Sequence, residues 1–326
     1  MRITPLLFLL LSLPLIAAEP KVLRDMAYAE PKNERQTLDV YSPAEGKDRP
    51  IIFWIHGGGW KRGDKKEVQK KPQIFVDKGF VFVATNYRFV PNVTVKEMMG
   101  DIAKAIRFVH DHASDYGGDP KSIIVMGHSS GAHLAALVCT DESYLKAEKL
   151  SFSILKGCVP VDVSAYDIPK LLKASGSVPP ETYKAIFTDK EETQREFSPV
   201  SYVAKGKDIP SFLILHVADR ADTKAQSQLF AEHLKTAGVS AKVVAAEGKT
   251  HGTINSDLGK SDDLPTRAVF EFLERVQKPR TLEFFKTKLE KTLTPAKAEI
   301  VFGKADRNIG SGLIIYEYDL DDGSKV

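Results

Sequence analysis

The sequence's clearest chemical pattern is the five-residue stretch Gly-His-Ser-Ser-Gly from Gly127 to Gly131. An apolar, β-branched run at 122–126 precedes it and a small-residue run at 132–137 follows it, so the pattern predicts a strand, a tight turn and a helix. Small residues two positions before and after the serine let the strand and helix backbones pass close together. The serine hydroxyl would then stand clear of the sheet at a helix N-terminus, where backbone N–H groups favour negative charge. Ser129 is therefore the candidate nucleophile.

A serine hydroxyl becomes a good nucleophile only when a base removes its proton and a third group orients that base. Of the eight histidines, His251 is the one in a glycine-flanked loop after the last strand expected in the main domain, which favours it as the base. The acid is expected in the loop after the preceding strand, 211–217. We choose Asp219 because it is nearer the strand end, and Asp222, which is typical of a helix cap, stays an alternative.

A second glycine-rich loop, 56–60, reads His-Gly-Gly-Gly-Trp and follows an apolar run typical of a strand buried on both faces. Consecutive glycines let the backbone approach a ligand and turn its N–H groups toward it. We expect the N–H groups of Gly58, Gly59 and Ser130 to form an oxyanion hole for a tetrahedral intermediate. Trp60 is a candidate substrate-binding wall. This chemistry requires no metal ion and no cofactor, and we expect neither.

Strands alternate with helices along most of the chain. This alternation predicts an α/β fold in which a mostly parallel central sheet carries helices on both faces, after an antiparallel hairpin at its start. The expected strands are 21–28, 37–41, 51–55, 80–85, 122–126, 152–163, 211–217 and 241–246, and the clearest helices are 95–112, 223–237 and 264–276.

Three segments fall outside this alternation. Residues 164–204 are rich in proline and predict a small cap inserted above the sheet, within a catalytic domain at 19–280. Residues 281–326 predict a short α+β appendage with a helix at 282–293 and a strand at 312–318, to which we assign no role. Residues 1–18 have a cationic start, an apolar core and a small-residue cleavage site, which is typical of a secretory signal peptide.

The amino-acid composition and net charge limit which classes of function and which locations we expect for this protein. The formal net charge is only +3, so nothing favours nucleic acid as a partner. No segment after the signal is apolar enough to cross a bilayer, so we expect a soluble, exported protein in the periplasm or outside the cell, with a retained membrane anchor as the alternative. The two cysteines, Cys139 and Cys158, lie in apolar runs; two buried thiols are favoured, and a disulfide stays open.

Several of these motifs together resemble a known family, the esterase/lipase branch of the α/β-hydrolases. The most similar groups are the bacterial feruloyl and acetyl-xylan esterases and the arylformamidases. The resemblance covers about 22–277 and implies the α/β-hydrolase fold with a nucleophile, acid, base order that Ser129, Asp219 and His251 reproduce. The usual Val-Pro after the acid is missing, which keeps Asp222 open. The motifs are His56 to Trp60, Gly63-Asp64, Asn86 to Arg88, Gly127 to Ala135 and His251-Gly252.

The resemblance implies a serine hydrolase that cleaves carboxylic esters through an acyl-enzyme. For an exported enzyme we expect a small-molecule or polysaccharide-linked ester, with acetyl or feruloyl esters of plant polysaccharide as the leading hypothesis. Two alternatives stay open. One is an arylformamidase-like amide hydrolase, and the other is a catalytically silent hydrolase fold used for binding.

Overall fold

The computed structural model describes residues 20–174 and 180–277, together with 305, 307, 308, 316–318, 320 and 325. The expected signal peptide at 1–18 and the expected helix at 282–293 lie outside the described residues. Of the expected appendage, the structure describes a two-residue antiparallel pair, β9 (Arg307–Asn308) with β10 (Tyr316–Glu317). No helix within the described ranges is both long enough and apolar enough to span a bilayer.

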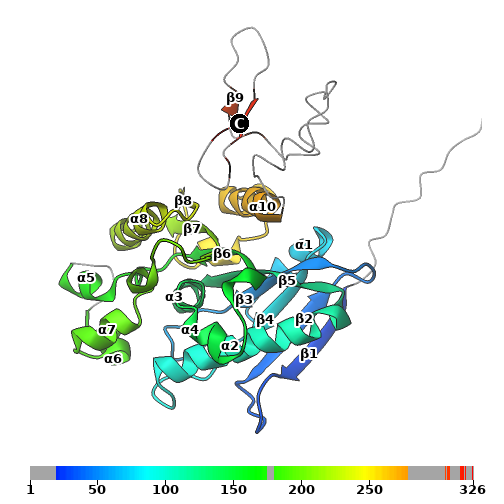
Figure 1. Ribbon diagram of the computed structural model, residues 1–326, viewed down its shortest axis with the longest axis horizontal. Coiled ribbons are helices and arrows are strands. Elements are labelled where there is room, and N and C mark those ends of the chain that lie inside the picture. Colours follow the sequence, from blue (N-terminus) through cyan, green and yellow to red (C-terminus); the bar gives the residue numbers. More distant parts are fainter. Residues whose placement is uncertain are drawn as a thin grey trace, which may run out of the picture.

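An eight-stranded sheet in the order β1-β2-β4-β3-β5-β6-β7-β8 forms the centre of the chain (Figure 1). The first two strands form the predicted antiparallel hairpin, β2 runs antiparallel to β4, and all other neighbours are parallel. The predicted fold class is thus confirmed. The strands are β1 (Lys21–Ala27), β2 (Thr37–Ser42), β3 (Arg49–Ile55), β4 (Val81–Thr85), β5 (Gly118–His128), β6 (Leu155–Val161), β7 (Ser211–Val217) and β8 (Ala241–Ala246).

Helices cover both faces of the sheet, because its central strands are apolar on both sides. Phe53 faces one buried apolar cluster and its neighbour Trp54 the other. The first cluster includes residues of α2, α3 and α8, and the second includes residues of α1 and α10; Figure 1 shows α1 and α10 on the opposite side of the sheet from α2 and α3. The bounds are α1 (Lys71–Asp77), α2 (Val95–His112), α3 (Ser130–Val138), α4 (Ser143–Ala147), α8 (Ala221–Thr236), α9 (Thr253–Ser256) and α10 (Leu264–Gln277).

The segment between β6 and β7 departs from the strand–helix alternation, as its proline content predicts. It forms short helices beside α3 and α4 rather than another layer of the sheet (Figure 1). These are α5 (Ile168–Lys173), α6 (Pro180–Phe187), α7 (Glu191–Glu196) and the 3-10 turn η3 (Pro199–Tyr202). We refer to residues 164–204 as the cap.

Local chemistry explains where several elements begin and end. The helix α2 has the predicted bounds because Thr94 and Glu97 form a reciprocal capping box at its start. The strand predicted at 152–163 is shorter, since 152–154 form a 3-10 turn and Asp162 has a φ of 52°. Cys139 and Cys158 are buried and unbridged, in agreement with the favoured prediction of two thiols.

Parallel register brings the carboxyl ends of six strands to one edge of the sheet. Ile55 pairs with Thr85 and Gly127, His128 with Val161, and Val161 with Leu215. Residues that follow β4, β3, β5, β6, β7 and β8 therefore meet at this edge, the usual location of ligand sites in parallel sheets. The candidate nucleophile, the glycine-rich loop and the candidate base all follow one of these strands.

The turn between β5 and α3 provides a stability test. A Cβ at Gly131 would lie 2.2 Å from the carbonyl oxygen of Ile55, whereas a Cβ at Gly100 in α2 would meet nothing within 4 Å. We expect Gly131→Ala to lower the free energy of unfolding by about 1–3 kcal/mol, and Gly100→Ala to raise it by about 0.5–1 kcal/mol. Urea unfolding of both variants measures this difference. Equal stability of the two variants would contradict the close approach.

Candidate active site

The turn that carries Ser129 is built as the sequence predicts. Ser129 has φ 55° and ψ −124° at the N-terminus of α3, a conformation that L-residues rarely adopt. A Cβ at Gly127 would lie 2.4 Å from the carbonyl oxygen of Gly131, so the two glycines permit the close passage of β5 and α3. The Ser129 N–H donates to the carbonyl of Val161 at 2.9 Å, which fixes the turn against β6.

His251 lies against the serine, in the loop between β8 and α9. Its Nε2 is 3.0 Å from Ser129 Oγ, within hydrogen-bond distance for removal of the hydroxyl proton. His128, the residue before the serine, donates from Nε2 to the carbonyl oxygen of His251 at 2.8 Å. Burial lowers the pKa of His128 to about 3, so its ring is neutral and available as a positioning donor. The structure therefore brings together the predicted nucleophile and the predicted base.

The acid was predicted wrongly. The carboxylate that contacts His251 Nδ1 belongs to Asp162, with Oδ2 at 2.6 Å. Asp219 has an exposed side chain on the turn after β7, and the alternative, Asp222, lies in the first turn of α8, where it pairs with Arg220 at 3.4 Å. The reason is that β6 ends directly beside the nucleophile strand, so a carboxylate at its end reaches the histidine. A single acidic residue inside the apolar run at 152–163 was the available signal.

Asp162 is fully buried yet held as a carboxylate by three donors. Burial opposes ionisation, but the hydrogen bond from His251, the Val217 N–H at 3.0 Å from Oδ1 and the charge of Arg220 together lower the pKa of Asp162. Nη1 of Arg220 lies 2.5 Å from Asp162 Oδ2 and 2.9 Å from His251 Nδ1. No motif in the sequence pointed to Arg220. Its guanidinium places a positive charge directly against the acid–base pair.

The glycine-rich loop lies against the nucleophile. A Cβ at Gly57 would come within 3.1 Å of Ser129 Cβ, and Gly58 and Gly59 have φ values of 127° and 63°. Within the described part of the chain, the N–H groups of Gly58, Gly59 and Ser130 donate to no protein acceptor. Donors of this kind beside a nucleophile can stabilise a developing oxyanion.

The Gly63-Asp64 and Asn86 to Arg88 motifs support this loop from behind. Tyr87 donates its hydroxyl to the carbonyl of His56 at 2.9 Å and stacks on the His56 ring at a centroid distance of 4.5 Å. The guanidinium of Arg35 bridges the Gly63 carbonyl and the Asp64 carboxylate at 2.9 and 3.0 Å. Asn86 donates to the same carboxylate at 3.1 Å. The Gly-Asp and Asn-Tyr-Arg motifs thus hold the backbone of the glycine-rich loop.

Trp60, the predicted substrate-binding residue, is largely buried between the glycine-rich loop and the cap. Its side chain is 4% exposed, and Nε1 donates to His133 Nδ1 at 3.3 Å. The ring packs edge-on against Tyr183 and Phe187 of α6, at centroid distances of 6.2 and 5.1 Å. Nε2 of His133 in turn donates to the carbonyl of Phe197. Trp60 therefore attaches the cap to the glycine-rich loop.

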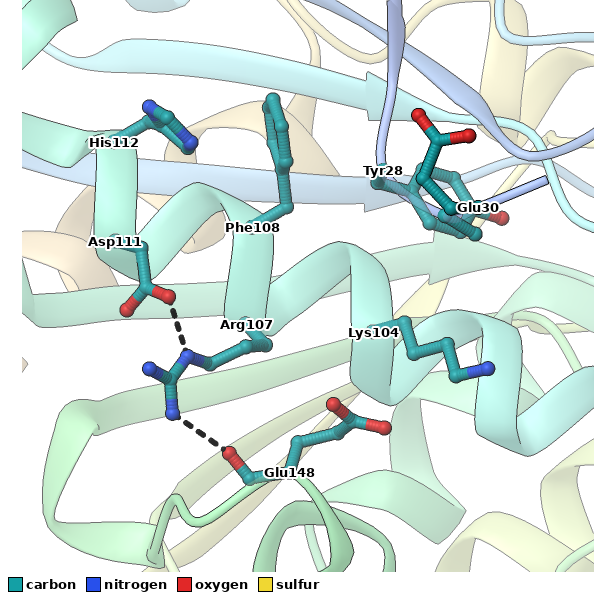
Figure 2. A pocket seen from close by; sticks show the side chains of 9 residues that line it. Tyr28, Glu30, Lys104, Arg107, Phe108, Asp111, His112 and Glu148 are labelled. Carbon is teal, nitrogen blue, oxygen red and sulfur yellow. Dashed lines mark hydrogen bonds and ion pairs between the residues drawn. The ribbon is translucent and has the colours of Figure 1, made fainter. Parts of the chain in front are cut away.

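A separate hollow of about 340 Å³ lies along α2, between residues 28–30 at the end of the first hairpin strand and Glu148 (Figure 2). Arg107 in its wall is tied to Asp111 and to the Glu148 carbonyl at 2.5 and 2.9 Å. None of its lining residues belongs to the serine, histidine and aspartate cluster. The candidate active site is therefore the strand-end cluster and not this hollow.

An eight-stranded, mostly parallel sheet with a serine turn after β5 and a histidine after β8 defines an α/β-hydrolase of the esterase branch. The family model BD-FAE matches residues 38–234, so this chain belongs to the BD-FAE family.

Named relatives agree with this assignment. A probable isoprenylcysteine alpha-carbonyl methylesterase from Arabidopsis thaliana is 30% identical over 71% of this chain and 51% of the relative. Kynurenine formamidase from Danio rerio is 25% identical over 78% of this chain and 82% of its own. The solved esterase Est2 from Thermogutta terrifontis is 28% identical, with a TM-score of 0.59 over 79% of this chain and 91% of that one. The chain spans about half the length of the plant relatives it matches.

The identity of the acid can be tested by the reactivity of the serine. We expect Asp162→Asn to slow labelling of Ser129 by a fluorophosphonate about 10³- to 10⁴-fold, because the base loses the group that orients it. The matched variant Asp219→Asn should label within about twofold of the wild-type rate. Labelling rates are read by intact-protein mass spectrometry. The reverse order of effects would restore Asp219 as the acid.

Proposed function

We propose that the protein is a serine hydrolase that cleaves carboxylic esters through an acyl-enzyme. The observation that carries the proposal is the chain of two contacts, 3.0 Å from Ser129 Oγ to His251 Nε2 and 2.6 Å from His251 Nδ1 to Asp162. A serine, a histidine and a carboxylate in this order can generate a nucleophile without any other group. The esterase names of several relatives point to the same chemistry.

The geometry supports a two-step reaction. His251 takes the hydroxyl proton as Ser129 attacks the ester carbonyl, and the imidazolium that forms is stabilised by the Asp162 carboxylate. The N–H groups of Gly58, Gly59 and Ser130 would receive the oxyanion of the tetrahedral intermediate. His251 then gives its proton to the departing alcohol. A water molecule, activated by the same histidine, attacks the acyl-enzyme and releases the acid.

The proposed substrates are acetyl or feruloyl esters, small or linked to plant polysaccharide. Two observations support them: the expected secretory signal at 1–18 and the resemblance of the motifs to feruloyl and acetyl-xylan esterases. An enzyme with such a signal would act in the periplasm or outside the cell, where polymeric substrates are accessible.

An amide-cleaving formamidase is the second candidate. The zebrafish kynurenine formamidase matches most of this chain and most of its own length, which favours keeping this alternative. The expected signal peptide weighs against it, because formylated tryptophan catabolites are processed inside cells. A binding protein without catalysis is opposed by the distance of 3.0 Å between base and nucleophile.

The proposal is tested with Ser129→Ala and a panel of substrates. The wild type should hydrolyse acetylated xylan or methyl ferulate faster than N-formylkynurenine, and Ser129→Ala should reduce the rate by about 10⁶-fold while the far-UV circular dichroism stays unchanged. The control Ser153→Ala, at an exposed position before β6, should retain full activity. Undiminished hydrolysis by Ser129→Ala would refute the mechanism. A preference for N-formylkynurenine would favour the second candidate.

A further inference from the structure

Lys71 is a fully buried lysine beside the loop of the candidate base, and the proposed mechanism does not use it. It is the first residue of α1, and its side chain is 0% exposed. Its Nζ donates to Gln69 Oε1 and to the carbonyl oxygen of Asn255, each at 2.8 Å, and lies 4.7 Å from the centre of the Trp54 ring. Within the described ranges it forms no ion pair.

A buried ammonium group with only neutral acceptors is costly for a fold. Burial lowers the pKa of Lys71 from 10.5 to about 7, and no nearby carboxylate offsets this effect. Two polar atoms of residues that contact Lys71, Trp54 Nε1 and Asn255 Oδ1, are buried. Neither has a hydrogen-bond partner within the described part of the chain. Apolar side chains would fill this position at lower cost, so the lysine requires a reason other than stability.

The carbonyl that Lys71 binds belongs to the turn that follows the base. The single helical turn α9 is folded onto the loop of His251: the Asn255 N–H donates to the Gly252 carbonyl at 3.2 Å, and the Ile254 N–H donates to the Thr250 carbonyl at 3.0 Å. The Asn255 carbonyl lies at the C-terminal end of this turn, where a cation binds most favourably. A shift of this carbonyl would carry the His251 loop with it.

The loop is held at a second point by the residue before the nucleophile. His128 Nε2 donates to the carbonyl of His251 itself, so the loop has one fixed point at the base and another four residues later. The two donors come from different elements, β5 and α1. With only the first fixed point, the loop could still rotate about the His251 carbonyl and change the direction of the imidazole.

We propose that Lys71 is a positioning residue that holds the His251 loop through the Asn255 carbonyl and thereby keeps His251 Nε2 within reach of Ser129 Oγ. This inference rests on the proposed serine hydrolase function. Its consequence is an effect on turnover with little effect on substrate binding, because the base acts in the chemical steps and Lys71 is buried away from solvent.

The experiment replaces Lys71 by methionine, which preserves the length and apolar stem of the side chain but removes the donor. We expect kcat per labelled serine to fall about 10- to 100-fold, since small misplacements of a catalytic group have effects of this size. KM should stay within about twofold, and the melting temperature should stay equal or rise. The matched control is Lys70→Met at the exposed preceding residue, which should change neither kcat nor KM.

Hydrogen exchange of the peptide covering 250–257 supplies a readout that does not depend on activity. Its amides should exchange faster in Lys71→Met than in the wild type and in Lys70→Met. An unchanged kcat, or unchanged exchange in this peptide, would overturn the proposal. A fall in kcat that only follows a loss of folded protein would also overturn it and leave Lys71 a structural residue.

If Lys71→Met does not fold, a third variant, Lys71→Gln, tests the proposal instead. Lys71→Gln has a shorter, neutral donor, and we expect a lowered kcat with an unchanged KM; wild-type kcat in this variant would overturn the proposal. Failure of the proposed function is recognised separately, because the wild type itself would then neither hydrolyse esters nor become labelled at Ser129.

Discussion

The close passage of three backbone segments around Ser129 is the constraint on which the rest of the site depends. Gly131 packs against the carbonyl of Ile55, Gly127 against the carbonyl of Gly131, and Gly57 against the Ser129 side chain. These contacts fix β3, β5 and α3 at one separation, so the nucleophile and the glycine-rich loop cannot move independently. Protein interiors are packed too densely to absorb even one methyl group at such points. The site is therefore rigid where the reacting carbonyl would lie.

The base is the part of the site that needs the most support. His251 lies in a loop, and loops lack the regular hydrogen bonds that hold strands in register. Its ring is oriented by Asp162 and its backbone carbonyl by His128, and the turn after it is held by Lys71. Strand β5, the residue directly after β6 and helix α1 thus contribute one donor or acceptor each. The sheet supplies rigidity to the loop through side chains rather than through backbone pairing.

Charge around the base is balanced and not simply negative. The Asp162 carboxylate and the Arg220 guanidinium both lie against Nδ1 of His251, at 2.6 and 2.9 Å. An acid paired with a guanidinium can orient the imidazole while its charge is partly neutralised. The turn after β7 therefore contributes a cation, although it was expected to contribute the acid. Asp162, at the end of β6, is the acid. Arg220, on the turn after β7 where the acid was expected, forms an ion pair with it.

Much of this protein follows from local patterns. Apolar runs predict the central strands of the main sheet, and the helix at 95–112 has its predicted bounds because its cap lies within the same few residues. The serine turn could be recognised because its requirements, small residues on either side of Ser129, are local. The position of His251 relative to Ser129 followed from the usual strand order.

What the sequence left open were contacts between residues distant in the chain. Asp162 and Asp219 both follow strands, and only the register of β6 beside β5 decides which carboxylate reaches His251. The burial of Trp60 likewise depends on where α6 packs. Periodicity and turn chemistry act over a few residues and therefore determine the elements themselves. The choice among equivalent side chains at the sheet edge is made by packing between elements, which only the tertiary structure specifies.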